Sequence, residues 1–134
     1  VIKPIFYTIG FFNEIKMKPL TEQELHNLAM NIVGKQLEAD GYEFMAVNST
    51  LKKNPQFVCL KNKKLHFIVV KCINYPNDPK DIDVDNLNKM KEHALKFEAD
   101  TYYAGVGLVN ATDYNKSVCL NEDYIVDYDG LVKI

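Results

Sequence analysis

The stretch NPQFVCLKNKKLHFIVVKC, residues 54–72, decides the fold prediction for this chain. It contains two runs rich in β-branched and aromatic residues, 56–61 and 64–73, separated by Asn62 and Lys63. Runs of this composition favour β-strands, and a two-residue break between them is typical of a β-hairpin. The stretch therefore predicts a hairpin with its turn at Asn62–Lys63.

A turn at that place also predicts which residues face each other across the hairpin. Gln56 should oppose Val69, and Asn54 should oppose Lys71. Because side chains alternate between the two faces of a strand, we expect Gln56, Val69 and Lys71 to share one face of the sheet.

The rest of the chain supplies two helices and further strands. Thr21 and Glu24 form a capping-box pattern ahead of an apolar helical face, and Leu87, Met90, Ala94 and Phe97 mark a second helical face. The predicted elements are helices at 22–39 and 83–98, and strands at 42–48, 56–61, 64–73, 101–111, 117–120 and 124–128, with a final turn leading to LVKI. This order, α-β-β-β-α-β with a short β tail, predicts an α/β fold with a central mixed sheet flanked by two helices.

Length and composition favour one globular domain. The chain has 134 residues, and we expect residues 17–134 to form the domain and residues 1–16 to be an extension outside it. No apolar run approaches the roughly 20 residues that span a bilayer. The three cysteines have no close spacing, which favours reduced thiols in a cytoplasmic protein over disulfides or a zinc site.

The hairpin and the order of elements around it resemble the restriction-endonuclease-like (PD-(D/E)XK) nuclease superfamily. The resemblance covers roughly residues 20–110 and depends on Pro55-Gln56 followed by Val69-Val70-Lys71. In that superfamily the first position after the proline and the position two before the lysine are carboxylates that hold a divalent metal, and the lysine assists the attacking water. The resemblance therefore implies a restriction-endonuclease-like fold in a degenerate member.

The two carboxylates are replaced here by Gln56 and Val69. Magnesium is usually anchored through carboxylates, so we expect no catalytic metal, no cofactor and no nuclease activity. An alternative is a metal-dependent nuclease whose acids have moved to a helix. The available acids are Asp81, Asp83, Asp85 and Glu92 near the second helix and Glu24 or Glu38 on the first. Capping and surface roles at helix starts are the simpler explanation for them.

A second alternative is weak, non-specific nucleic-acid binding by a lysine-rich hairpin. Residues 44–77 carry six lysines and no acid, although the net charge of the whole chain is −2. The candidate residues for this binding are Lys52, Lys53, Lys61, Lys63 and Lys64. The chain contains no arginine, the usual residue for bidentate contacts to bases and phosphates, so sequence-specific reading of DNA is not expected.

No other residue group in the sequence indicates an enzyme. We expect His26 and His93 on polar helix faces and His66 on the strand face opposite Lys71, and no Ser–His or Cys–His arrangement is evident. GVG at 105–107 is no phosphate loop, and its glycines predict close packing or a bend. The sequence thus predicts a non-catalytic binding or interaction protein whose partner is another protein or a second copy of itself.

Overall fold

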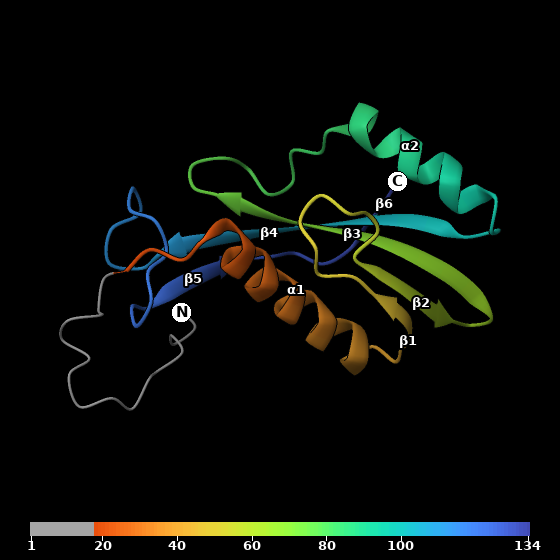
Figure 1. The fold of residues 1–134 in the computed structure, drawn as a ribbon, viewed down its shortest axis with the longest axis horizontal. Helices are drawn as coiled ribbons and strands as arrows, with labels where there is room; N and C mark the ends of the chain where they lie inside the picture. Colours follow the sequence, from red (N-terminus) through yellow and green to blue (C-terminus); the bar gives the residue numbers. More distant parts are fainter. Residues whose placement is uncertain (1–17) are drawn as a thin grey trace.

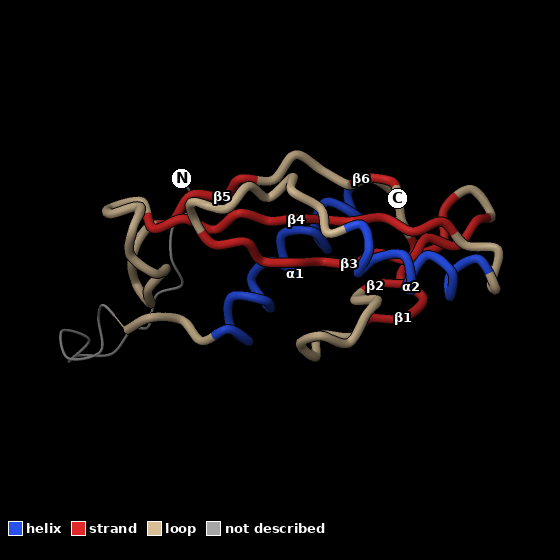
Figure 2. Tube along the Cα trace, turned by 90° about the horizontal axis from the view of Figure 1, so that it is seen from above, coloured by secondary structure: helices blue, strands red, loops and turns tan. Residues whose placement is uncertain are grey.

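The computed structural model describes residues 18–134, so the predicted extension at 1–16 lies outside the described residues. The helices are α1 (Glu22–Ala39) and α2 (Val84–Leu95), and the strands are β1 (Glu43–Val47), β2 (Phe57–Lys61), β3 (Lys64–Asn74), β4 (Asp100–Asn110), β5 (Tyr124–Asp127) and β6 (Val132–Lys133). The strands form one mixed sheet in the order β1-β2-β3-β4-β5, with β6 paired to β4 as well (Figure 1). Figure 2 shows these strands side by side from β5 to β1. The predicted α/β class and element order are confirmed.

Helix α1 begins where the sequence predicts it to begin. The Thr21 hydroxyl accepts from the Glu24 amide, and the Glu24 carboxylate accepts from the Thr21 amide, so the capping box is complete. The buried face of the helix comprises His26, Ala29, Met30, Val33 and Leu37. The prediction that His26 lies on a polar face is therefore wrong. Its position is one turn before Ala29 and Met30, so helical periodicity turns it toward the sheet.

The hairpin β2–β3 has the predicted turn. Asn62 and Lys63 both have positive φ, 53° and 63°, as the two-residue turn of a right-twisted hairpin requires. The antiparallel ladder runs from Lys61 opposite Lys64 to Phe57 opposite Ile68. The predicted pairs of Gln56 with Val69 and of Asn54 with Lys71 lie beyond that last pair. The chain leaves the ladder there, because the backbone N–H of Gln56 donates to the carbonyl of Ile68. Ile68 is the residue that Phe57 opposes, so Gln56 is one residue out of register.

A parallel β3–α2–β4 unit forms the centre of the sheet, with β3 and β4 paired from His66–Asp100 to Asn74–Leu108. Helix α2 ends at Leu95 and not at 98. Glu98 has a positive φ of 56°, and the Ala99 amide bonds back to the Ala94 carbonyl, which closes the helix. Phe97 consequently lies beyond the helix and is 54% exposed, so its predicted place on the buried face is wrong.

Alternating side chains of β3 divide the core into two layers. Ile68 and Val70 pack with α1 on one face, whereas Phe67 and Val69 pack with α2 on the other. On the α2 side, the loop before that helix passes directly over β4. A Cβ on Gly105 would overlap the carbonyl oxygen of Pro79, which confirms that these glycines permit close packing.

The predicted strand at 117–120 is wrong. Its only strand-like pairing within residues 18–134 is an isolated bridge between Pro19 and Cys119, flanked by hydrogen bonds of Leu20 to Val118 and of Leu120 to Lys18. The segment that carries Pro19 enters α1 at Glu22, so no ladder can develop.

Candidate functional site

A cleft of about 520 Å³ lies where β2 has ended and where no other strand of the described residues 18–134 pairs with that edge of β3. Helix α1, the loop between β1 and β2, and the start of α2 form its other walls. The residues that line it are Glu22, Leu25, His26, Leu51, Lys52, Asn54, Gln56, Val70, Lys71, Cys72, Asn74 and Asn86. The structure therefore brings Gln56 and Lys71 into one site.

Gln56 is fully buried and its amide is committed to local hydrogen bonds. Its Oε1 accepts from the Val70 amide at 2.6 Å, and its Nε2 donates to the Lys53 carbonyl at 3.2 Å and to Asn54 Oδ1 at 2.9 Å. The side chain thus replaces the missing strand at the edge of β3 and anchors the loop before β2. A carboxylate could not make these three bonds, because two of them need a donor.

Val69 does not line the cleft. It is 0% exposed and packs in the α2 layer with Phe67 and Leu87. Of the three residues that the sequence analysis singled out in the hairpin, the structure gathers Gln56 and Lys71 in the cleft and separates Val69 from them. The alternation that predicts a shared face fails at Gln56, because its departure from the ladder turns its side chain toward the edge of β3.

Lys71 is half-buried and lines the cleft without an ion pair to any acid in residues 18–134. Lys52 supplies a second ammonium from the β1–β2 loop, and Glu22 is the only carboxylate that residues 18–134 contribute to the lining. The cleft therefore has an excess of hydrogen-bond donors and a local positive charge, which suits a ligand with anionic or accepting groups.

His26 and Glu22 are site residues that the sequence prediction missed. His26 is 5% exposed, and its Nε2 is buried without a hydrogen-bond partner in the described part of the chain. Burial lowers the pKa of its imidazole, against a smaller opposing effect of Glu22. The Nε2 atom is inaccessible to solvent, so the imidazole forms part of the wall of the cleft and does not offer this nitrogen to a bound group. The spacing of His26 from Ala29, Met30 and Val33 is the signal that could have revealed its inward position.

Cys72 borders the same cleft but is a poor nucleophile. Burial raises the pKa of its thiol to about 11, so very little thiolate exists near neutral pH. The side chains that remain are amides and apolar groups, which recognise ligands but do not activate them. The lining thus offers binding chemistry and no activated nucleophile.

Two of the acids considered as relocated metal ligands, Glu24 and Asp83, occupy capping positions at the two helix starts. Hydrogen bonds from Thr21 hold the pKa of Glu24 below its usual value, and Asp83 accepts from the Asn86 amide at 3.2 Å. Neither lines the cleft. Across residues 18–134 there is no cluster of three or more His, Cys, Asp or Glu side chains that could hold a metal ion.

The six lysines of residues 44–77 do not form one patch. One group surrounds the hairpin turn: Lys61, Lys63 and Lys64. The other lies at the opposite end of β2: Lys52, Lys53 and Lys71. The five residues of β2, at about 3.3 Å each, separate the groups by about 16 Å. In the first group the Lys64 ammonium pairs with Asp100 at 3.3 Å, and the Lys61 ammonium lies 4.7 Å from the ring centre of Tyr42. Two of the three positive charges near the turn therefore already have partners.

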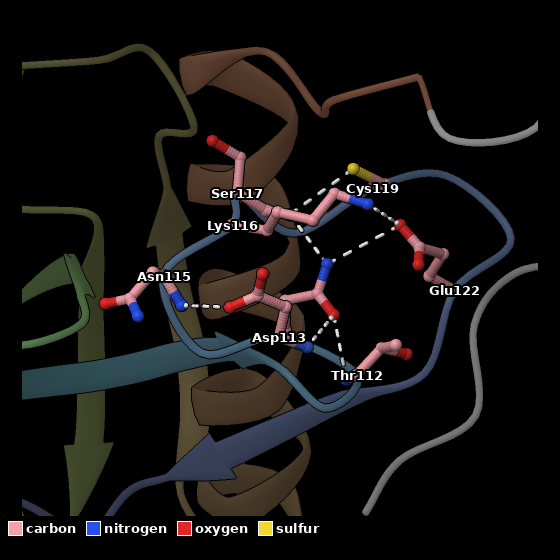
Figure 3. A network of polar contacts seen from close by, with 8 residues as sticks. Thr112, Asp113, Asn115, Lys116, Ser117, Cys119 and Glu122 are labelled. Atoms are coloured by element: carbon pink, nitrogen blue, oxygen red, sulfur yellow. Dashed lines mark hydrogen bonds and ion pairs between the residues drawn. The ribbon is translucent and has the colours of Figure 1, made fainter.

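A second polar cluster lies in the loop that follows β4 (Figure 3). Asn110 is fully buried, and its Oδ1 accepts from the amides of Thr112 and Asp113 while its Nδ2 donates to the Ser117 carbonyl at 2.9 Å. The Glu122 carboxylate lies 3.5 Å from the same Nδ2 and 3.7 Å from the Lys116 ammonium. These groups satisfy one another, so the cluster holds the loop in place and leaves the cleft as the candidate site.

Comparison with known proteins places the chain in a family. Neither the curated proteins nor the solved structures contain a match to it. No helix within residues 18–134 is long and apolar enough to cross a membrane. The model of one family, described as a domain of unknown function (DUF8840), matches residues 23–134, which include every helix and strand except the first residue of α1. This chain belongs to the DUF8840 family.

Proposed function

We propose that this protein is a non-catalytic binding domain with a nuclease-like fold, and that the cleft beside β3 is its ligand site. The observation that carries the proposal is the buried amide of Gln56, with its three hydrogen bonds. It stands where the resemblance to the restriction-endonuclease-like superfamily expects a metal-binding carboxylate. Because these hydrogen bonds hold the edge of β3 and the loop before β2, they support the view that the residue at position 56 stabilises the fold.

The cleft itself supports a binding role. Lys71 and Lys52 present donors to it, and within residues 18–134 no strand covers the edge of β3 beyond Ile68. We propose a ligand with an anionic or accepting group, carried by a protein partner. The three cysteines are free, which fits a reducing compartment such as the cytoplasm.

The alternative is a metal-dependent nuclease with relocated acids. One observation favours it: Glu22 lies in the same cleft as Lys71. A single carboxylate would have to hold the metal alone, and magnesium sites in proteins usually combine one or two carboxylates with substrate phosphates. Weak binding of nucleic acid without cleavage is a third reading, supported by the lysines alone.

Calorimetric titration with Mn²⁺ separates these functions. We expect no saturable binding in the native protein and no cleavage of plasmid DNA in the presence of Mn²⁺. Saturable binding that Glu22→Gln abolishes, together with cleavage, would contradict the proposal. Glu24→Gln is the matched control, because that carboxylate lies outside the cleft.

Binding in the cleft can be measured by NMR titration with succinate and with inorganic phosphate. We expect saturable shifts at the amides of Lys71, Cys72 and Asn74, and their loss in Lys71→Met. Shifts that Lys71→Met leaves unchanged, or no shifts with either probe, would count against the cleft as the ligand site.

A further inference from the structure

The edge of β3 beyond Ile68 turns backbone groups toward the cleft. The last bonds across the hairpin run from the Gln56 N–H to the Ile68 carbonyl and from the Val70 N–H to Gln56 Oε1. Figure 1 shows that β3 continues past the end of β2. Because the peptide groups of alternate residues point to the same side of a strand, those of Cys72 and Asn74 also point to this open side, and the residues between them bond β4.

Four of these backbone groups have no hydrogen-bond partner in residues 18–134. They are the carbonyls of Val70 and Cys72 and the N–H groups of Cys72 and Asn74. The Val70 N–H is bonded to Gln56, and the Asn74 carbonyl accepts from the Asn77 amide. The open row therefore starts with an acceptor and ends with a donor, and it spans about 13 Å at about 3.3 Å per residue.

An added strand that runs parallel to β3 matches this row. In a parallel pair, each bonding residue donates its N–H to the carbonyl before its opposite residue and accepts from the N–H after it. A residue opposite Lys71 bonds the Val70 carbonyl and the Cys72 N–H. The residue two positions later, opposite Ile73, bonds the Cys72 carbonyl and the Asn74 N–H. An antiparallel strand would instead leave two of its own peptide groups facing the occupied Val70 N–H and Asn74 carbonyl.

The walls of the cleft select the side chains of such a strand. The residue opposite Lys71 places its side chain beside an ammonium that has no ion pair in residues 18–134, so a carboxylate is complementary there. The next residue points to the other face, where Leu25 and Val70 supply apolar surface. The third lies beside Ile73, which is half-buried, so an apolar side chain suits it too.

We propose that the cleft binds an extended peptide segment of a protein partner as a strand parallel to β3, with side chains in the order acidic, apolar, apolar. The inference rests on the proposed binding function, and it specifies the class of ligand. The charges of the cleft favour an acidic segment, because Lys71 and Lys52 outnumber Glu22 in its lining. A nucleic acid lacks the alternating N–H and carbonyl groups that the edge of β3 can pair with.

The probe is the blocked peptide acetyl-Glu-Leu-Val-amide, titrated into the isotope-labelled full chain and followed by NMR. We expect hydrogen exchange to slow at the amides of Cys72 and Asn74 and to stay unchanged at Lys71 and Ile73, which bond β4. N-methylation of the peptide's glutamate or valine removes an N–H that bonds β3 and should raise the dissociation constant about tenfold.

N-methylation of the leucine is the matched control, because its N–H points away from β3, and it should leave the dissociation constant unchanged. Equal effects of the three methylated peptides would overturn strand pairing. An effect of leucine methylation alone would show an antiparallel strand and would overturn the proposed direction.

A peptide with glutamine in place of glutamate tests the contact with Lys71. The glutamate peptide should bind Lys71→Met about tenfold more weakly than the native protein, whereas the glutamine peptide should bind both equally. Lys53→Met is the matched control, because Lys53 is exposed and lies outside the cleft, and it should leave both affinities unchanged. An equal loss for both peptides in Lys71→Met would overturn the placement of the acid.

Succinate and phosphate separate a failure of this inference from a failure of the proposed function. If these anions shift the amides of the cleft and the peptide does not bind, the inference fails and the proposed function stands. If the peptide and both anions leave the amides unchanged, both fail. Shifts of the same amides with a DNA oligonucleotide, and none with the peptide, would also overturn the inference.

Discussion

Replacing Gln56 by glutamate tests whether this position is structural or a vacant metal site. The change keeps the size of the side chain and the oxygen that accepts from Val70, but it removes both donated hydrogen bonds. Their loss costs about 2 kcal/mol, at about 1 kcal/mol each. Burying the carboxylate adds roughly 1–2 kcal/mol, since the nearby Lys71 ammonium offsets only part of the desolvation. We therefore expect Gln56→Glu to lower the free energy of unfolding by about 3–4 kcal/mol at pH 7.5.

The cost should depend on pH. Burial raises the pKa of the introduced carboxyl above its value of about 4.3 in the unfolded chain. The protonated carboxyl can donate one hydrogen bond, so the part of the cost due to its charge is absent below about pH 4. That part returns as the pH rises through the folded-state pKa.

Urea denaturation of the native protein and the variant at pH 5 and pH 7.5 measures both effects. Gln23→Glu is the matched control, because Gln23 Nε2 also donates two hydrogen bonds, to Asn27 Oδ1 and to the Ser49 carbonyl, but in an exposed setting. It should change stability by less than about 1 kcal/mol. A Gln56→Glu protein that is as stable as the native one and binds Mn²⁺ would refute the reasoning.

Three further changes and one binding series give additional tests. Lys71→Met should be neutral or stabilising by up to about 1 kcal/mol in a thermal melt, because it keeps the packing of the stem and breaks no ion pair; a loss of several kcal/mol would show a buried network. Gly105→Ala should destabilise by several kcal/mol, on the order of a severe overpacking, because the Pro79 carbonyl occupies the space; a native-like melting temperature would contradict this. Since burial lowers the pKa of His26, the unfolded chain takes up more protons and stability falls as the pH drops below about 6.5; His26→Phe should flatten that dependence in urea titrations at pH 5.5 and 7.5. Fluorescence anisotropy on DNA and RNA should show weak, salt-sensitive binding without sequence preference, because the lysines form two separate groups. Tight binding at physiological salt would contradict this expectation.

Local signals in the sequence determined most of the secondary structure. The capping box at Thr21 and Glu24, the periodicity of α1 and the two-residue turn at Asn62–Lys63 each depend on residues a few positions apart, and all are found in the structure. The hairpin register follows from the turn alone, because a two-residue turn fixes which residues pair. That positions 56 and 69 hold Gln and Val and not carboxylates was likewise visible in the sequence.

Only the tertiary structure decided what surrounds those positions. Gln56 leaves the ladder to bond Val70, and His26 turns inward beside Glu22, because the end of β2 exposes the edge of β3 between two helices. The lysines that are close in sequence separate because the hairpin carries them to opposite ends of a strand. The exposure of β1 is also a tertiary property. Its residues favour a strand, but the sheet order places that strand at the edge, and α1 packs on β3 and β4. Both faces of β1 are therefore exposed. Such contacts join residues distant in the chain, and a local pattern does not encode them.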